Sequence, residues 1–450
     1  MASYRKKFNV KFNFIGAPEG WLEKFSSLVN SGQVPDAFFY LTDQGAYKTY
    51  VENDIVLPLD SVVDNGTPYL NKLLQTDQFF NTKINNKFYF MPLGAPDGVG
   101  LFVRRDWMEK LNIKDPSTMD ELALMFRRFT EEDPDGDGKA NTVGLAASKL
   151  VYWLWWFAVP FGVTPGWTKD ENGKYQIAEL YPEYKQFLSW MQNIYTKGHM
   201  LNEFFLLDES QKDVSFYAGQ TGCLISNGGI KIDEIVGKMN QANAKAKVDI
   251  IMMPTGKWYN TGGYFGGWSI SSSAKEPYRL AKIFDYLISP EGSNLRCYGI
   301  EGVHYNITNG IFKPNYEERK KDGVYMSVDT TKPNGNHVMG VQFSIEPYII
   351  TNKGIECTRQ YGSFANPDLI KKSDDLAKNA TQIAYQPLNY LNFPDEYFAI
   401  NKKLKDISEI YMVRIISGDI SVEMGIDMMK GEFEQAGYER AQEIVQQTLK

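Results

Sequence analysis

The sequence predicts an α/β protein that is built of two lobes. At 450 residues the chain is too long for one small domain, so two substantial hydrophobic cores are expected. Short apolar stretches that alternate like strands are interleaved with stretches of helical periodicity. No internal repeat and no Gly/Ser-rich linker divides the chain into halves. This interleaving favours two lobes that several strands connect.

The first predicted elements form a strand–helix–strand unit. Apolar residues alternate over residues 8–14, which predicts a strand, and recur with helical spacing over residues 21–29. Residues 37–41, Ala-Phe-Phe-Tyr-Leu, predict a second strand, and a helix is expected around 46–53. A unit of this kind predicts a parallel sheet with the helix packed across it.

Further elements follow along the whole chain. Thr118 and Glu121 have the spacing of a capping box, and an apolar stripe behind them predicts a helix. Additional strands are expected over residues 88–91, 99–103, 223–225 and 248–252. Additional helices are expected over residues 184–195 and 277–287 and through most of the last 60 residues.

Residues 133–142, Asp-Pro-Asp-Gly-Asp-Gly-Lys-Ala-Asn-Thr, have the spacing of a calcium-binding loop. Oxygen donors fall at loop positions 1, 3, 5 and 9, a glycine makes the turn at position 6, and a backbone carbonyl is available at position 7. The predicted Ca²⁺ ligands are Asp133, Asp135, Asp137, Lys139 through its carbonyl, and Asn141.

The same loop departs from an EF-hand at position 12. That position requires a bidentate Glu, and here it is Gly144, with no obvious helix after it. We therefore expect a structural calcium clip on an extracellular protein, where calcium is abundant, rather than a calcium switch. The alternative interpretation is an Asp/Gly-rich turn that binds no ion.

Composition argues against several classes of function. The net charge is -7 and no block of Lys and Arg stands out, which argues against nucleic acid and anionic membranes as partners. The 3 Cys and 3 His residues are scattered, so a metal cluster or a Ser-His-Asp triad is poorly supplied. Aromatic residues reach 14%, which is typical of a protein that binds a flat, partly apolar ligand.

Membrane and targeting signals are missing from the sequence. No run of about 18 apolar residues could span a membrane. The chain begins Met-Ala-Ser-Tyr-Arg-Lys-Lys and enters the first predicted strand directly, without a signal peptide. Taken literally this indicates a cytosolic protein, but we expect instead that the sequence lacks its natural start.

Several phrases of the chain resemble motifs of one protein family, in the family's order. They lie at residues 28–36, 103–111 with 116–121, 133–145, 289–292 and 298–305. Together they resemble the extracellular solute-binding proteins, family 1, of bacterial ABC sugar importers, in particular the lipoproteins that bind oligosaccharides. The family's signal peptide and lipid-anchored cysteine are absent here, and Asn141 and Thr142 weaken the charge of the calcium loop.

The resemblance implies a periplasmic-binding-protein-like fold: two α/β lobes, a hinge and a ligand cleft between the lobes. The expected N-terminal lobe comprises residues 1–103 and about 254–345, and the C-terminal lobe residues 104–253 and about 346–450. Hinge strands are expected near 94–101, 253–267 and 340–352. Closure of the lobes on the ligand would signal to the transporter.

Aromatic and polar residues are the candidates for ligand binding, because rings stack on sugar faces and polar groups bond the hydroxyls. The stretch 152–157 holds Trp153, Trp155 and Trp156, of which the first and last share a helix face. Core packing is the alternative role for all three. The other candidates are Asp43, Gln44, Asp97, Tyr264, Phe265 and Trp268, with Trp167, Glu301 and Arg359 as weaker ones.

These further candidates lie where a ligand could be reached. Asp43 and Gln44 follow a predicted strand, and Asp97 enters the first expected hinge. Trp268 lies in a glycine-rich segment, where the backbone can approach a ligand closely. The polar residues could equally cap turns or helices.

The leading functional hypothesis is a non-enzymatic, monomeric protein that captures an oligosaccharide for import. Its implied partners are the ABC transporter permease subunits, and its implied link to the membrane is a lipid anchor outside this chain. No catalytic residue is expected. The alternative is a glycoside hydrolase or lyase with paired carboxylates, although no spacing singles out such a pair. A calcium-stabilised adhesion module is a third possibility, and it predicts repeated calcium loops.

Overall fold

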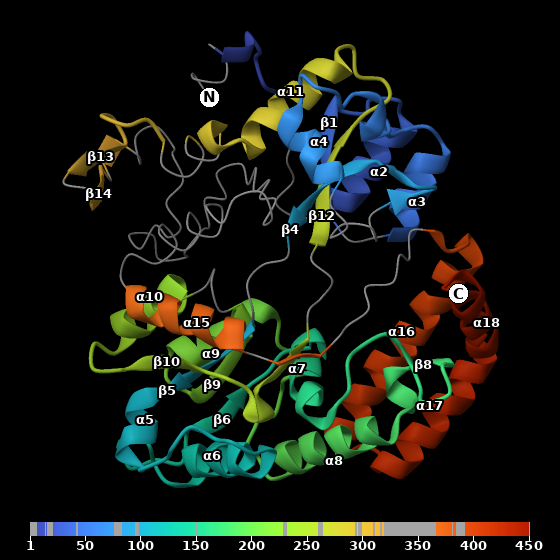
Figure 1. Cartoon of the computed structure of the whole chain (residues 1–450). Helices are drawn as coiled ribbons and strands as arrows, with labels where there is room; N and C mark the ends of the chain where they lie inside the picture. The colour runs from blue at the N-terminus through green and yellow to red at the C-terminus, as the bar shows by residue number, and fades with distance from the viewer. Residues whose placement is uncertain are drawn as a thin grey trace.

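The helices and strands form two groups, which we call the first lobe and the second lobe (Figure 1). The first lobe is built around a three-stranded sheet and the second lobe around a four-stranded sheet. The computed structural model describes residues 7–13, 15, 21–41, 44–75, 83–94, 99–149, 151–227, 232–259, 264–292, 295, 299–308, 311–315, 317–318, 366–379, 381–383 and 392–449.

The first-lobe sheet has the strand order β1-β12-β4 and is antiparallel throughout. Its strands are β1 (Ala37–Leu41), β4 (Phe90–Gly94) and β12 (Tyr264–Ile270). Gly267 lies in the central strand, where an added Cβ would be 2.4 Å from the carbonyl oxygen of Met91. Glycine is therefore needed for β12 and β4 to approach each other.

Helices cover both faces of this sheet, because successive strand residues point to opposite sides. Phe38 and Phe90 pack in one core cluster, which draws on α2 (Trp21–Asn30) and α3 (Gln44–Glu52). The opposite face packs against the 3₁₀-helix η1 (Leu59–Ser61), α4 (Pro68–Leu74) and α11 (Pro277–Ile288). The lobe thus has three layers, and the predicted helices at 21–29, 46–53 and 277–287 are confirmed within a few residues.

The strand predicted over residues 8–14 is wrong for the residues described there. Residues 9–13 form no strand, and Asn9 adopts a positive φ of 51°, which interrupts an extended chain. Phe8, Val10 and Phe12 nevertheless pack against the first-lobe core. The predicted parallel pairing is also wrong, since β1 pairs with β12 in the antiparallel sense.

The second-lobe sheet has the strand order β10-β5-β9-β6. β5 (Val99–Arg104) lies between β10 (Val248–Ile251) and β9 (Thr221–Asn227) and is antiparallel to both. β6 (Val143–Ala146) is parallel to β9. β5 thus belongs to the second sheet, whereas the sequence analysis placed residues 99–103 in the N-terminal lobe; the other expected lobe boundaries stay predictions.

One face of the second sheet carries α6 (Met119–Glu131), α7 (Trp155–Ala158) and α8 (Pro182–Thr196). The Thr118 side chain caps α6 by accepting a hydrogen bond from the Glu121 amide at 3.1 Å, as the sequence predicts. The four residues of the predicted stripe are fully buried: Leu122, Met125, Phe126 and Phe129. The other face carries α9 (Glu209–Tyr217), α10 (Ile232–Ala242) and α15 (Pro367–Asn379).

The last helices extend the core of the second lobe along one side (Figure 1). They are α16 (Asp395–Ile416), α17 (Val422–Ala436) and α18 (Tyr438–Thr448). The start of α16 also contacts the first lobe, because Asp395 pairs with Lys48 of α3 at 2.9 Å. Shorter elements are α5 (Arg105–Lys110) and the ribbons β2 (Lys83–Ile84) with β3 (Lys87–Phe88), β7 (Trp167–Lys169) with β8 (Tyr175–Ile177), β11 (Lys257–Tyr259) with β15 (Thr381–Ile383), and β13 (Tyr305–Thr308) with β14 (Ile311–Pro314).

Candidate functional site

One edge of the second-lobe sheet, which we call the carboxyl edge, is the side from which the chain reaches the first lobe. Val99, which begins β5 soon after β4 of the first lobe, pairs with Asn227, the last residue of β9. β6 is parallel to β9, so its end at Ala146 points to the same edge. Open α/β sheets bind ligands at the carboxyl ends of their strands. The described side chains that follow β6 are therefore candidates for ligand binding.

Two neighbouring aromatic residues lie just beyond β6. Tyr152 and Trp153 belong to the 3₁₀-helix η3 (Val151–Trp153), and their rings meet edge to face with centroids 5.2 Å apart. The Tyr152 side chain is 41% exposed and Trp153 is partly buried. Exposed rings of this kind offer the flat apolar surface on which a sugar face stacks.

The indole of Trp153 takes part in a cluster of hydrogen-bonded side chains around Glu209. We call this set, which consists of Ser148, Trp153, Glu209 and Lys212, the Glu209 cluster. The Glu209 carboxylate accepts hydrogen bonds from Trp153 Nε1 at 2.6 Å, from Lys212 Nζ at 2.7 Å and from the Ser148 hydroxyl. A charged acceptor makes such bonds stronger than neutral ones.

Lys212 is the most buried charged member of this cluster and is only 1% exposed. Its ammonium group is 5.0 Å from the centre of the Trp153 ring and 3.6 Å from the Asp213 carboxylate. It also donates to the carbonyl oxygen of Ile225 in β9 at 3.4 Å, which ties α9 to the sheet. A buried ammonium requires such compensation, and two carboxylates supply it.

The start of α9 places Glu209 by local sequence chemistry. Asp208 caps the helix, and its side chain and that of Gln211 exchange hydrogen bonds with the backbone in a capping box. Glu209 follows as the first helical residue. The sequence analysis did not single out Ser148, Glu209 or Lys212. The Asp208-to-Gln211 spacing could have located the helix start, but nothing in the sequence pairs Glu209 with Trp153.

The two other tryptophans of this stretch are core residues. Trp155 is 8% exposed and stacks on Tyr184, with centroids 5.2 Å apart and an interplanar angle of 25°. Trp156 is 3% exposed and belongs to the same core cluster. Their burial favours the packing role that the sequence left open, and of the three tryptophans Trp153 is the most accessible to a ligand.

Among the candidates in the first lobe, the structure describes the side chain of Trp268. Trp268 of β12 packs on the first-lobe core, with its ring 5.6 Å from Phe39 and 6.3 Å from Phe284. This packing also favours a core role. Asp43 and Asp97 lie outside the described residues, as do the side chains of Gln44, Tyr264 and Phe265.

Of the weaker candidates, the structure describes Trp167 and Glu301. Trp167 is 3% exposed and stacks on Tyr438 at 5.5 Å. Glu301 is exposed, beside the β13–β14 ribbon, and Arg359 lies outside the described residues.

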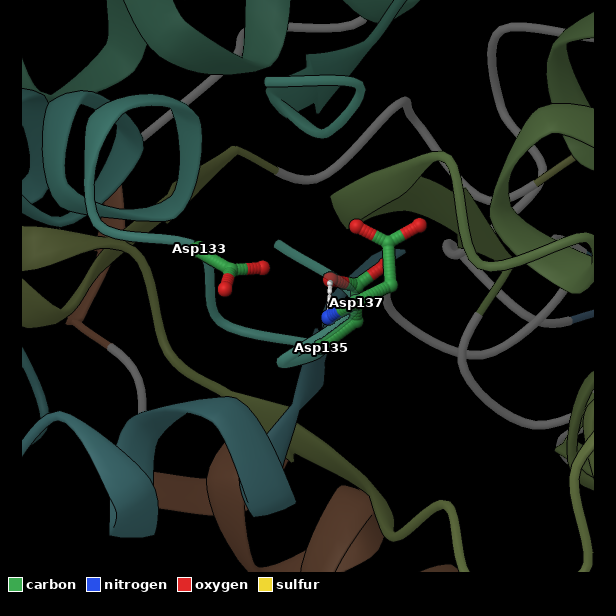
Figure 2. Close-up of side chains that lie close together, drawn as sticks. All are labelled: Asp133, Asp135 and Asp137. Carbon is green, nitrogen blue, oxygen red and sulfur yellow. Dashed lines mark hydrogen bonds between the residues drawn. The ribbon is translucent and has the colours of Figure 1, made fainter. Parts of the chain in front are cut away.

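The three aspartates of the predicted calcium loop come together after α6 (Figure 2). One carboxylate oxygen from each of Asp133, Asp135 and Asp137 lies within 4.8 Å of the others. Positive φ angles at Asp133 (46°), Gly136 (79°) and Gly138 (77°) turn the backbone around them. Carboxylate oxygens at such spacing suit a hard cation such as Ca²⁺.

Backbone amides shape the loop from within. The Asp133 carboxylate accepts from the Gly136 and Gly138 amides at 3.1 and 3.2 Å, and Asp137 accepts from the Lys139 amide at 2.8 Å. The Asn141 side chain donates to Asp137 at 2.9 Å. These bonds hold the loop in shape and leave further acceptor capacity on the carboxylates.

The aspartates influence each other's ionisation. Partial burial, followed by the hydrogen bond to Asp133 and the negative charges of Asp137 and Asp133, raises the pKa of Asp135 above its ordinary value. For Asp133, burial opposes ionisation, but the Asp135 side chain and the Gly138 and Gly136 amides outweigh it and lower the pKa. A carboxylate with a raised pKa beside like charges is one that a bound cation would stabilise.

Packing explains why the loop lacks the twelfth ligand of an EF-hand. Gly144 lies in β6, where an added Cβ would be 2.5 Å from the backbone of Phe126 in α6. The loop is followed by this strand. Just before the strand begins, the Thr142 hydroxyl donates a hydrogen bond to the Phe129 carbonyl at 2.8 Å. The prediction that no EF-hand helix follows is confirmed.

Comparison with known sequences identifies the family. A family model described as bacterial extracellular solute-binding protein matches residues 4–294. Polygalacturonan/rhamnogalacturonan-binding protein YtcQ of Bacillus subtilis (strain 168) is 30% identical over 247 residues, which cover 53% of this chain and 48% of that protein. Lipoprotein LipO of the same strain is 25% identical over 334 residues, covering 67% of this chain and 62% of that protein. The matched regions thus span less than two thirds of these relatives' own lengths.

Solved structures share the fold over nearly the whole chain. Alginate-binding protein AlgQ2, crystallised without calcium ion, has a TM-score of 0.75 at 18% identity, covering 99% of this chain and 92% of that one. An extracellular solute-binding protein of Bifidobacterium longum subsp. infantis has a TM-score of 0.72 at 15% identity, covering 99% and 93%. The fold is the two-lobed one of solute-binding proteins, as the sequence predicts. The chain belongs to the bacterial extracellular solute-binding protein family.

Proposed function

We propose that this chain is the substrate-binding component of an ABC importer and that it captures an oligosaccharide between its two lobes without chemical change. The family membership supports the binding role. YtcQ is named for binding polygalacturonan and rhamnogalacturonan, and another relative, FusA of Streptococcus pneumoniae serotype 4, is named as a fructooligosaccharide ABC transporter substrate-binding protein. FusA is 23% identical to this chain over 155 residues, which cover 31% of this chain and 28% of FusA.

The observation that carries the proposal is the Tyr152–Trp153 pair at the carboxyl edge. The pair combines an exposed phenol ring with an indole that Glu209 holds in place. Stacking on such rings recognises the apolar face that sugars of many kinds share, and neighbouring polar groups select among them. Binding of a sugar there, with closure of the first lobe over it, is a hinge-type transition that a permease can detect.

The aspartate loop serves in this proposal as a structural calcium clip. The side chains of Asp133, Asp135, Asp137 and Asn141 and the carbonyl of Lys139 would hold the ion. The ion would join the end of α6 to the start of β6, so it would stabilise the second lobe without touching the ligand.

Location and partners follow from the same proposal. Within the described part of the chain, no helix has the length and apolar character needed to cross a membrane. As a substrate-binding component, the protein would deliver a captured sugar to permease subunits, at the outer face of the cell membrane or in the periplasm. The family name and the lipoprotein relative support an extracellular location.

Isothermal titration calorimetry against neutral and uronate oligosaccharides tests the proposal. We expect a Kd of about 1 μM or tighter for at least one chain, with the sugar recovered unchanged. Replacing Trp153→Ala should weaken that binding about tenfold or more. Trp190→Phe is the control, because Trp190 lies on α8 and donates to the Met119 carbonyl within the core.

Two outcomes would contradict the proposal. A folded protein that binds none of the sugars would exclude oligosaccharide capture. Cleaved sugar products would favour the hydrolase or lyase alternative instead.

A further inference from the structure

We propose that Glu209 is a positioning residue for ligand binding: it fixes the indole of Trp153 in the orientation on which a sugar stacks. The inference rests on the proposed function, but it assigns roles to residues that do not themselves touch the ligand. It is carried by the hydrogen bonds, burial and charge of the Glu209 cluster.

Glu209 has few acceptor positions left for a sugar hydroxyl. One carboxylate oxygen accepts from the Ser148 hydroxyl, and the other accepts from both Trp153 Nε1 and Lys212 Nζ. Charge-assisted bonds of this length have a narrow range of geometry. Glu209 therefore acts through Trp153, whose only polar atom it engages.

The same bond defines what Trp153 can offer. The indole N–H is the single donor of the side chain and it is directed at Glu209. The ring can then contact a ligand through its apolar surface alone. Trp153 thus recognises the face of a sugar ring and leaves recognition of its hydroxyls to other groups.

Lys212 supports the same arrangement from the interior of the protein. Its ammonium bonds to Glu209 and lies 5.0 Å from the Trp153 ring centre, and the residue is 1% exposed. If Glu209 let go of Lys212, a buried ammonium would lose one of its two carboxylate partners. The ring is consequently held in one orientation before any ligand arrives, which reduces the entropy lost on binding.

Binding measurements on three variants test this role. Glu209→Ala removes every acceptor and should raise the Kd for the preferred sugar about tenfold. Glu209→Gln keeps an acceptor for the indole N–H and should restore the Kd to within about threefold of wild type. The matched control is Glu432→Ala, because Glu432 accepts the Tyr411 hydroxyl at the same 2.6 Å distance but on α17.

A spectroscopic measurement distinguishes positioning from general loss of structure. The near-UV circular dichroism of wild type minus that of Trp153→Phe isolates the band of the fixed indole. We expect Glu209→Ala to lose this band and Glu209→Gln to retain it, with far-UV spectra unchanged. In the Trp153→Phe background, Glu209→Ala should have little further effect on the Kd, since the bond is already absent.

The outcomes separate this inference from the proposed function. The dichroism needs no ligand, so it tests the positioning role even if the protein binds no sugar. A Glu209→Ala variant that keeps both the Trp153 band and the wild-type Kd would overturn the inference. Equal losses in Glu209→Ala and Glu209→Gln would also overturn it, because they would indicate that the charge contacts the ligand directly.

Discussion

Two regions of the second lobe are organised around carboxylates, and they differ in the groups that surround these carboxylates. In the Glu209 cluster one carboxylate receives three donors, among them the buried ammonium of Lys212. In the aspartate loop three carboxylates lie within 4.8 Å, and their donors are mainly backbone amides. Two exposed ammonium groups lie near the loop: Lys110 donates to the Asp133 carbonyl, and Lys139 is 3.8 Å from the Asp137 carboxylate.

This difference shows how the same functional group serves two purposes. A carboxylate whose acceptors are occupied holds a neighbouring group in place, as Glu209 holds Trp153. Carboxylates that gather with acceptor capacity to spare repel one another until a cation joins them. In our proposal the first arrangement orients a ring for a ligand, and the second binds an ion.

The largest expected effect comes from removing the cation of the Glu209 cluster. Lys212→Met should lower the free energy of unfolding by about 3 kcal/mol, because it leaves Glu209 and the buried Asp213 without their ammonium. Urea denaturation measures the loss. Lys185→Met is the control, since Lys185 pairs with Glu423 at 3.0 Å on the exposed surface, where a pair contributes less than about 1 kcal/mol. Equal losses would erase the contrast between buried and exposed pairs.

Calcium should stabilise the aspartate loop by a comparable amount. At a free concentration about 100 times its Kd, a bound ion adds about 2.7 kcal/mol to the free energy of unfolding. Thermal unfolding with calcium, with magnesium and with EDTA measures this effect. Asp137→Asn should abolish the response to calcium, and Lys212→Met should leave it intact. An unchanged melting temperature at millimolar calcium would assign the loop to an ordinary turn.

Adding any side chain at the missing EF-hand position should destabilise the protein. Gly144→Ala is expected to cost about 2 kcal/mol, because its Cβ would lie 2.5 Å from the α6 backbone at Phe126. Gly138→Ala tests the loop itself, since its surroundings are open but its φ is 77°. Urea denaturation should show the larger loss at Gly144. A neutral Gly144→Ala would mean that α6 can move away from β6.

The smallest expected effect concerns the repulsion within the loop. The pKa of Asp135 is raised, so its ionised form is disfavoured in the folded protein, and stability falls as the pH rises through that pKa. Without calcium, Asp135→Asn should therefore raise the free energy of unfolding near pH 7, by less than about 0.5 kcal/mol at this exposed site. The gain should vanish near pH 3, where wild type is protonated as well. With calcium the sign should reverse, because a ligand is lost.

Much of the fold was predictable because local periodicity determined it. The stripe of Leu122, Met125, Phe126 and Phe129 predicts α6, and all four residues are buried. The strand at 8–14 failed because alternation of apolar residues records burial and does not guarantee pairing. The antiparallel order of the first sheet could not be predicted from local patterns, since β12 comes from a distant part of the chain.

The candidate sites show the same contrast between residues that are close in the sequence and residues that are far apart in it. The aspartate loop could be read from the sequence, because its ligands lie within nine consecutive residues and backbone turns bring them together. Trp153 was found only as one of three equivalent tryptophans, and burial separates it from Trp155. Glu209 is 56 residues from Trp153, and only the packing of α9 beside the end of β6 brings them to 2.6 Å. The sequence by itself thus determined what short-range geometry controls, and the tertiary structure decided what depends on contacts between distant segments.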